Sequence, residues 1–250
     1  MVEPVIEICA NSVESCRQAE AGGAARVELC AGIPEGGTTP SWGEMTAARK
    51  AAGIKINAII RPRGGDFLYS ETEAEVMLAD IEAARRAGVD GVVFGCLGRD
   101  GGIDTGLTEC LKDAAAGLST TFHRAFDVCR DPFGALEEII GLGFDRILTS
   151  GQKNTAWEGR ELIARLVDKA AGRIIIMPGS GVNQENIAEL ARTTGAAEFH
   201  MSARERVPSA MEYRNDMVSM GGTVTINEYS QEITSAEKVK RIINALRSDA

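Results

Sequence analysis

Short apolar runs alternate with longer amphipathic stretches along most of the chain. Each run has the length and the side-chain types of a strand, and the stretches between the runs repeat their apolar positions with the period of a helix. The predicted strands are Val5–Cys9, Arg26–Cys30, Lys55–Ile60, Gly91–Gly95, Ser119–His123, Arg146–Ser150, Arg173–Met177 and Ala197–Met201. The predicted helices are Ser12–Ala21, Ser41–Ala52, Glu71–Ala87, Thr105–Ala116, Pro132–Gly141, Ala156–Ala171, Asn183–Thr194 and Ser235–Ser248.

Eight strands that alternate with helices predict an α/β protein of the (β/α)8 TIM-barrel class. An open doubly wound sheet usually has fewer strands and carries a Gly-x-Gly-x-x-Gly turn after the first one, and no such turn follows Cys9. The chain has 250 residues, the usual size of one such barrel, and no Pro- or Ser-rich linker divides it. We therefore expect a single TIM-barrel domain over residues 1–250.

One segment does not fit this alternation. Gly221–Thr234 precedes the last predicted helix, and Thr223–Asn227 within it has the pattern of a strand. We expect an extra C-terminal arm before the last helix, with a long surface loop as the alternative. An arm that packs on a second subunit is a further interpretation.

The composition restricts the class of function. Hydrophobic residues make up 44% of the chain, enough for a sizeable core, and the net charge is −9. Because nucleic acids and anionic membranes bind clustered Lys and Arg, this charge argues against both as partners. The chain has no apolar stretch near the ~18 residues of a membrane-spanning helix, and its start does not resemble a signal peptide. We expect a cytoplasmic protein whose six cysteines, which form no Cys-x-x-Cys pair, are reduced.

The chain has two histidines, and each of them lies at the end of a predicted strand, His123 and His200. In a TIM barrel the carboxyl ends of the strands form the mouth that holds active sites, so we expect both imidazoles in one pocket. An imidazole can act there as a general acid, a general base or a metal ligand. Asp127 is expected to orient His123 through a hydrogen bond to its ring. The structural alternative is that each imidazole only satisfies a buried carboxylate.

The first two predicted strands repeat a Glu-x-Cys pattern, with Glu7 and Cys9 on one and Glu28 and Cys30 on the other. Side chains alternate along a strand and adjacent strands lie ~4.8 Å apart, so these carboxylates and thiols are expected to cluster inside the barrel mouth. Buried carboxylates need a partner. Arg61, at the end of the third predicted strand, is expected to neutralise them.

Two loops are candidates for binding an anionic ligand. The first loop contains Arg61 and Arg63, whose planar guanidinium groups suit a carboxylate or a phosphate. The alternative for this loop is that its arginines only neutralise the buried glutamates.

The second loop follows the seventh predicted strand and contains Gly179, Ser180 and Gly181. A helix is predicted to begin near Asn183, so its N-terminal N–H groups would be available to an anion. Phosphate is frequently bound by the loops after strands seven and eight, and Ser202 lies at the end of strand eight. The alternative is an ordinary turn.

Six ordered motifs resemble those of the CutC family of copper homeostasis proteins, over about residues 4 to 210. The motifs are Glu7-Ile-Cys-Ala-Asn11, Arg61-Pro-Arg-Gly-Gly-Asp-Phe-Leu-Tyr69, Thr121-Phe-His-Arg-Ala-Phe-Asp127, Leu148-Thr-Ser-Gly151, Met177-Pro-Gly-Ser-Gly-Val182 and Glu198-Phe-His200. The resemblance implies a cytoplasmic TIM barrel, commonly a homodimer, that is linked to copper tolerance and has no established enzymatic reaction. The shared motifs add Thr149 and Ser150 to the ligand-binding candidates.

Copper is the metal that this resemblance implies. Cu(I) prefers thiolate and thioether ligands, so Cys9 and Cys30 are the expected metal ligands, with Met177 or Met201 nearby. The structural alternative is that small buried cysteines fill space in the core.

The alternative function is an enzyme that acts on a small anionic metabolite, including a phosphorylated one. Glu7, Glu28, His123, His200 and Asp127 are its candidate catalytic residues. No lysine ends a predicted strand, which argues against a Schiff-base aldolase, and we expect no nucleotide cofactor.

Overall fold

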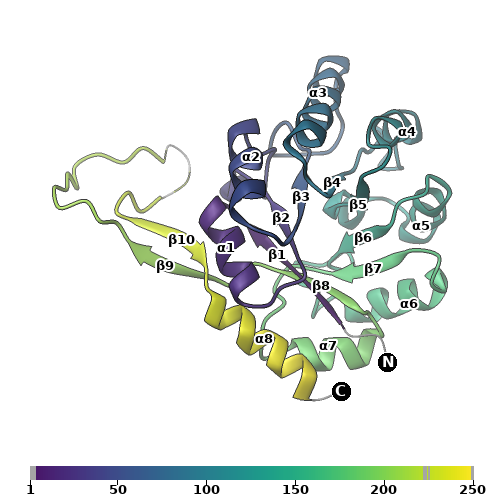
Figure 1. Ribbon diagram of the computed structural model, residues 1–250. Coiled ribbons are helices and arrows are strands. Elements are labelled where there is room, and N and C mark those ends of the chain that lie inside the picture. Colours follow the sequence, from purple (N-terminus) through teal and green to yellow (C-terminus); the bar gives the residue numbers. More distant parts are fainter. Residues whose placement is uncertain (1–3, 222–223, 225, 249–250) are drawn as a thin grey trace.

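The computed structural model describes residues 4–221, 224 and 226–248. Within these residues, eight parallel strands form one sheet in the order β7-β6-β5-β4-β3-β2-β1-β8. The strands are β1 Val5–Ala10, β2 Arg26–Leu29, β3 Lys55–Ile59, β4 Gly91–Phe94, β5 Ser119–Phe122, β6 Arg146–Thr149, β7 Ile175–Pro178 and β8 Glu198–Met201. The terminal strands of this order, β7 and β8, pack against each other, so the sheet curves into a nearly closed barrel (Figure 1). The predicted TIM barrel is confirmed.

The helices surround the barrel and cover its outer face (Figure 1). They are α1 Val13–Ala21, α2 Trp42–Ala51, α3 Glu71–Ala87, α4 Thr105–Ala114, α5 Pro132–Gly141, α6 Arg160–Ala170, α7 Ile187–Thr194 and α8 Ala236–Ser248. Polar caps fix several of the starts: Ser70 accepts a hydrogen bond from the N–H of Glu73, whose side chain accepts one from the N–H of Ser70.

Two helices begin four residues later than the sequence pattern predicts. α6 begins at Arg160 rather than at Ala156, and α7 begins at Ile187 rather than near Asn183. Before α7, the side-chain amides of Asn183 and Asn186 both donate to the carbonyl of Gly181 and hold this segment as a turn. Side-chain bonds of this kind compete with helical backbone bonds, which explains the later start.

The pairing of β1 with both β2 and β8 determines which side chains meet inside the barrel. The register aligns Glu7 with Arg26 on β2 and with His200 on β8. Ile6 and Ile8 alternate with Glu7 and pack in the hydrophobic core. The inner face of β1 is therefore polar and its outer face is apolar.

The arm before the last helix is a β-hairpin that extends away from the barrel (Figure 1). Its strands, β9 Arg204–Pro208 and β10 Ser230–Thr234, pair in the antiparallel direction. The sequence pattern predicts an extra strand at Thr223–Asn227, but Thr223 and Thr225 lie outside the described residues and the strand is found further along the chain. Several large apolar residues between the two strands are exposed, namely Met211, Tyr213, Met217, Val218 and Met220. No helix among the described residues is long and apolar enough to cross a membrane.

Candidate functional site

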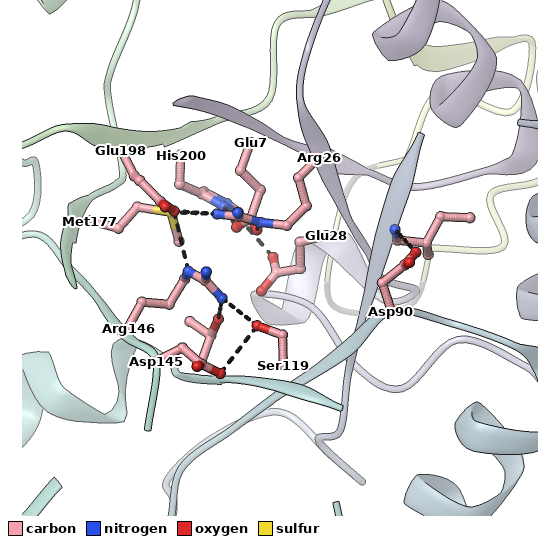
Figure 2. Close-up of polar contacts among 12 residues, drawn as sticks. Glu7, Arg26, Glu28, Asp90, Ser119, Asp145, Arg146, Met177, Glu198 and His200 are labelled. Atoms are coloured by element: carbon pink, nitrogen blue, oxygen red, sulfur yellow. Dashed lines mark hydrogen bonds and ion pairs between the residues drawn. The ribbon is translucent and has the colours of Figure 1, made fainter. Parts of the chain in front are cut away.

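A fully buried carboxylate, Glu7, lies at the centre of a charged network inside the barrel. Its Oε1 lies 2.8 Å from Nδ1 of His200, and its Oε2 accepts a hydrogen bond from Nε of Arg26. Figure 2 shows the three side chains converging from β1, β2 and β8. The strand register thus gives the buried carboxylate two partners, as a buried charge requires.

The network continues toward the opposite side of the barrel through Glu198 and Arg146 (Figure 2). Oε2 of Glu198 lies 2.6 Å from Nη2 of Arg26 and 3.2 Å from Nε of Arg146. Arg146 also donates to the hydroxyl of Ser119 over 2.7 Å. Two carboxylates and two guanidinium groups therefore compensate one another in the interior.

The prediction that Arg61 neutralises Glu7 and Glu28 was wrong. Arg26 pairs with Glu7, and the guanidinium of Arg61 donates instead to backbone carbonyls of the loops that follow β2 and β3, over 2.8 to 2.9 Å. Arg61 lies beyond the end of β3 at Ile59, so the alternation of a strand does not determine where its side chain points.

The carboxyl groups of Glu7 and Glu28 have very different pKa values. Burial alone raises the pKa of Glu7, but the positive charges of Arg26 and His200 outweigh burial and lower it to about 2. Burial raises the pKa of Glu28 to about 8, although the charge of His200 opposes this increase. Burial lowers the imidazole pKa of His200. The nearby Glu28, Cys9 and Glu7 outweigh the effect of burial and raise this pKa well above its usual value.

Glu28 is only partly satisfied by its surroundings. Its Oε2 lies 3.6 Å from Nε2 of His200, and its Oε1 is buried without a hydrogen-bond partner among the described residues. An unsatisfied buried oxygen is uncommon in native proteins and marks a place where a ligand, an ion or a proton can be accommodated.

Cys9 and Cys30 lie side by side at the ends of β1 and β2, with their sulfur atoms 3.2 Å apart. Together with Glu28 they offer three ligand atoms within 4.8 Å of one another, so three members of the predicted cluster lie together; the fourth, Glu7, pairs with Arg26 and His200 instead. Nη2 of Arg204, at the start of β9, lies 4.0 Å from the sulfur of Cys9.

The two thiols have opposite tendencies to ionise. A hydrogen bond from Cys30 lowers the pKa of Cys9 well below its usual value against the effect of burial, and His200 and Arg204 contribute in the same direction. The same hydrogen bond, together with burial, raises the pKa of Cys30 well above its usual value. The pair therefore favours a thiolate at Cys9 and a thiol at Cys30, and a thiolate is the form that binds metal.

A cavity of about 680 Å³ opens at the carboxyl ends of the strands. Both histidines line it, which confirms that the ends of β5 and β8 face one pocket. The other lining residues include Cys9, Glu28, Arg61, Phe67, Asp127, Leu148, Ser180, Gly181, Met201, Ser202 and Arg204. The volume is in the range that small-molecule sites occupy.

His123 is buried in the wall of this cavity, and Asp127 does not orient it as predicted. The ring accepts a hydrogen bond at Nδ1 from the backbone N–H of Ala125, over 3.3 Å, and Nε2 has no partner among the described residues. Burial, assisted by the positive charge of Arg61, lowers the pKa of the imidazole to about 3. His123 is therefore neutral near physiological pH.

Asp127 instead joins the loop after β5 to the end of β6. Its carboxylate accepts hydrogen bonds from the hydroxyl of Thr149 over 2.5 Å and from the backbone N–H of Ser150 over 2.9 Å, and it pairs with Arg124 over 2.7 Å. Thr149 and Ser150 are buried by these contacts. Their predicted role in ligand binding therefore gains no support from the geometry.

Arg63 stabilises its own loop. Its guanidinium pairs with Glu73 and with Asp66, the latter over 3.1 Å, and stacks on the ring of Tyr69 at 5.3 Å. Among the described residues, Arg61 lines the cavity and Arg63 does not.

The Gly179–Gly181 turn differs from the prediction in one respect. Ser180 and Gly181 line the cavity, but α7 begins only at Ile187, so the turn does not lie at a helix N-terminus. The hydroxyl of Ser180 already donates to the carbonyl of Asn154 over 2.8 Å, and a side chain at Gly179 would collide with Leu148. The expected use of helix N–H groups for an anion is therefore wrong for this turn.

Sequence reasoning did not single out Arg26, Glu198, Arg146 or Arg204. A signal for two of them was present: Arg26 shares its strand face with Glu28, and Glu198 shares its face with His200. Arg204 follows the last barrel strand, and its position beside Cys9 results from the hairpin geometry, which the barrel pattern does not predict.

Comparison with known proteins identifies the family. The family model described as CutC family matches residues 4–205. The chain belongs to the CutC family. A family protein CutC from Parabacteroides distasonis is 61% identical over 240 residues, which cover 96% of this chain and 99% of that relative. The copper homeostasis protein cutC homolog of Homo sapiens is 49% identical over 242 residues, which cover 97% and 88%.

A solved structure supports the CutC assignment. The crystal structure of the CutC protein from Streptococcus agalactiae has a TM-score of 0.76 and 36% sequence identity, and the match covers 80% of this chain and 98% of that chain. A thiamine phosphate pyrophosphorylase from Pyrococcus furiosus has a TM-score of 0.59 at 14% identity, covering 98% and 96%. At that identity the likeness concerns the barrel fold alone.

Proposed function

We propose that this CutC-family chain binds Cu(I) through Cys9 and Cys30. The observation that carries the proposal is the 3.2 Å separation of the two sulfur atoms at the edge of the cavity. Relatives named for copper homeostasis support it. Thiolates are the ligands that Cu(I) prefers, and the lowered pKa of Cys9 favours that form.

The residues around the pair fit a soft monovalent ion. Two sulfurs on opposite sides of one ion stand ~4.6 Å apart if each bond is close to the ~2.3 Å of a zinc–sulfur bond. The sulfurs therefore need to separate when the ion binds, and Cys9 is partly exposed and lines the cavity. Met201 also lines the cavity and is the candidate thioether ligand, whereas Met177 lies deeper, 3.5 Å from Nη2 of Arg26.

The test is a Cu(I) titration against a bathocuproine-type competitor. We expect one Cu(I) per wild-type chain, a loss of binding in the Cys9→Ser/Cys30→Ser double variant, and no change in Cys110→Ser, whose thiol is exposed and remote from the pair. An unchanged stoichiometry in the double variant contradicts the proposal.

A second titration with Zn²⁺ separates a soft site from a mixed one. Zn²⁺ accepts thiolate, imidazole and carboxylate ligands together, so Glu28 could contribute to a zinc site beside the two cysteines. If the site is specific for Cu(I), Glu28→Gln keeps Cu(I) affinity. If the chain binds Zn²⁺ more tightly than Cu(I), and Glu28→Gln abolishes the binding of Zn²⁺, the site is a divalent-metal site instead.

We propose further that the chain acts as a homodimer in the cytoplasm. The apolar residues exposed on the hairpin, Met211, Tyr213 and Met217, support the dimer because a second copy would bury them. Light scattering after size-exclusion chromatography should give twice the mass of one chain, and Met211→Ser/Met217→Ser should shift it toward the monomer. A single-chain mass for the wild type contradicts the dimer.

A second candidate function is the binding of a small anionic metabolite in the cavity. It is favoured by Arg61, a buried guanidinium that lines the cavity and has no carboxylate within 4.0 Å among the described residues. Buried charges are normally paired, and a bound anion would supply the missing partner. Copper binding at the cysteine pair does not depend on this function.

A further inference from the structure

The guanidinium of Arg61 is held in place by neutral groups. Nη1 donates to the carbonyls of Glu35 and Gly37 over 2.8 and 2.9 Å, and Nη2 donates to the carbonyl of Gly65 over 2.9 Å. Nε is buried and has no partner in the described part of the chain. Glu35 also lines the cavity, but its carboxylate accepts from the N–H of Gly64 over 3.2 Å. The positive charge of Arg61 is thus fixed in position without a counter-ion from the described part of the chain.

His123 offers a hydrogen-bond donor in the same part of the cavity. Because Nδ1 accepts from the N–H of Ala125, the proton of the neutral ring lies on Nε2. This Nε2–H is buried and finds no acceptor among the residues that the structure describes. A buried donor left unpaired costs ~1–3 kcal/mol, which an acceptor atom from a ligand would recover.

Phe67 connects the two groups. Its ring lies 4.9 Å from the ring of His123, and Cζ of Arg61 lies 5.0 Å from its centre. The charge of Arg61 acts on His123, since it helps to keep that imidazole neutral. All three side chains line the cavity, so a fixed positive charge and an unpaired N–H donor adjoin one half-buried aromatic ring.

We infer that Arg61, His123 and Phe67 form an oxyanion subsite that binds the carboxylate or phosphate group of a small organic acid. The inference rests on the second function proposed above and specifies where the anion binds. The acidic group lies near Arg61 and accepts a hydrogen bond from Nε2 of His123. The carbon skeleton extends along Phe67 toward the apolar wall at Leu148 and Met201. The neutral imidazole can fill this role because its one N–H, at Nε2, is a hydrogen-bond donor for an oxygen atom of the anion.

The experiment uses the fact that the chain has only two histidines. Imidazole ¹⁵N spectra of the full-length chain therefore contain two ring systems, which His123→Phe assigns. The probes are pyruvate for the carboxylate and glycerol 3-phosphate for the phosphate, with glycerol as the uncharged control. We expect one or both anions to shift the Nε2 resonance of His123 in a saturable way, and we expect glycerol to leave it unchanged.

Two arginine variants supply the matched comparison. Arg61→Gln should weaken binding of the active probe by about 10- to 100-fold, the usual value of a charged hydrogen bond. Arg173→Gln, which breaks an exposed pair with Glu137 outside the cavity, should leave binding unchanged. Cys9→Ser/Cys30→Ser should also retain the anion. The wild-type spectra test the inference even if Arg61→Gln fails to fold.

Three outcomes separate the inference from the function on which it rests. A shift of the Nε2 resonance of His123, together with weaker probe binding in Arg61→Gln, supports both the subsite and the anion-binding function. Binding of an anion that neither shifts His123 nor responds to Arg61→Gln overturns the subsite but leaves an anionic ligand in the cavity. Absence of binding by both anions at millimolar concentration overturns both, and leaves copper binding at the cysteine pair as it stands.

Discussion

Replacing Arg26 with methionine removes a cation from the buried charge network and keeps a side chain of similar length. In Arg26→Met, the described contacts leave Glu7 with His200 as its partner and Glu198 with Arg146. We expect the free energy of unfolding to fall by about 3–5 kcal/mol, the usual result when one member of a buried ion pair is removed.

The pKa of Glu7 gives a separate measure of this effect. The carboxyl group titrates at about 2 in the folded chain, compared with an ordinary value of 4.5. The difference corresponds to roughly 3 kcal/mol in favour of the charged form in the folded state. Because the folded pKa lies below the unfolded one, this stabilisation is present above pH 4.5 and is lost as the pH falls toward 2. Arg26 is the largest favourable contributor, so a substantial part of the stabilisation should disappear with it, and His200 should supply the rest.

Urea denaturation monitored by circular dichroism measures the change. The control is Arg173→Met, which breaks the exposed pair with Glu137 and should leave the midpoint almost unchanged. The double variant Arg26→Met/Glu7→Gln should be more stable than Arg26→Met, because it also removes the buried carboxylate that has lost its guanidinium partner. The acid side of the stability profile should flatten in both Arg26 variants.

Two results would refute this reasoning. The first is a midpoint for Arg26→Met equal to that of Arg173→Met, which would mean that the network contributes no more than a surface pair. The second is a double variant less stable than Arg26→Met, which would mean that Glu7 stabilises the fold through contacts other than the ion pair.

Three further predictions follow from the described contacts. The imidazole of His123 should stay neutral until the pH approaches 3, so its ¹⁵N resonances should not titrate near pH 6.5. The free energy of unfolding should fall as the pH drops below 6.5, because the ring then binds a proton in the unfolded chain but not in the folded one. Gly91→Ala should destabilise the barrel by ~1–3 kcal/mol in urea denaturation, because the new Cβ would lie 2.6 Å from a backbone oxygen of β5. Gly141→Ala should not, since outside the adjoining backbone of α5 no described atom lies within 4 Å of the new Cβ. In mildly acidic buffer iodoacetamide should label Cys9 before the more exposed Cys110, because the pKa of Cys9 is lowered. Peptide mass spectrometry gives the order of labelling. Labelling of Cys110 before Cys9 contradicts the assignment of a thiolate to Cys9.

Strand periodicity predicts the barrel, the proximity of Cys9 to Cys30 and the shared pocket of His123 and His200. These features depend on which residues end strands and on which face they lie, and both are local properties of the sequence. The repeat of Glu-x-Cys on neighbouring strands is the clearest case, because parallel pairing places the two motifs side by side.

The wrong assignments concern residues that lie outside regular strands. Arg61 and Asp127 follow β3 and β5, where alternation no longer determines direction and loop hydrogen bonds do. The carbonyl groups that hold Arg61 come from two different loops, and the partners of Asp127 come from the end of β6. Such contacts depend on how distant loops pack, and a single sequence without relatives does not contain that information.

The pairing of β1 with β8 has a consequence for biosynthesis. Cys9 and Cys30 lie on strands that emerge early from the ribosome, whereas His200 belongs to the last strand of the barrel and reaches Glu7 only after that strand is made. At roughly 5–20 residues per second, translation from Cys30 to His200 takes on the order of 10–30 s. During that interval the nascent chain carries both thiols without the strand that completes the barrel around them. Premature oxidation or metal capture by unfinished chains is therefore a hazard specific to this strand order.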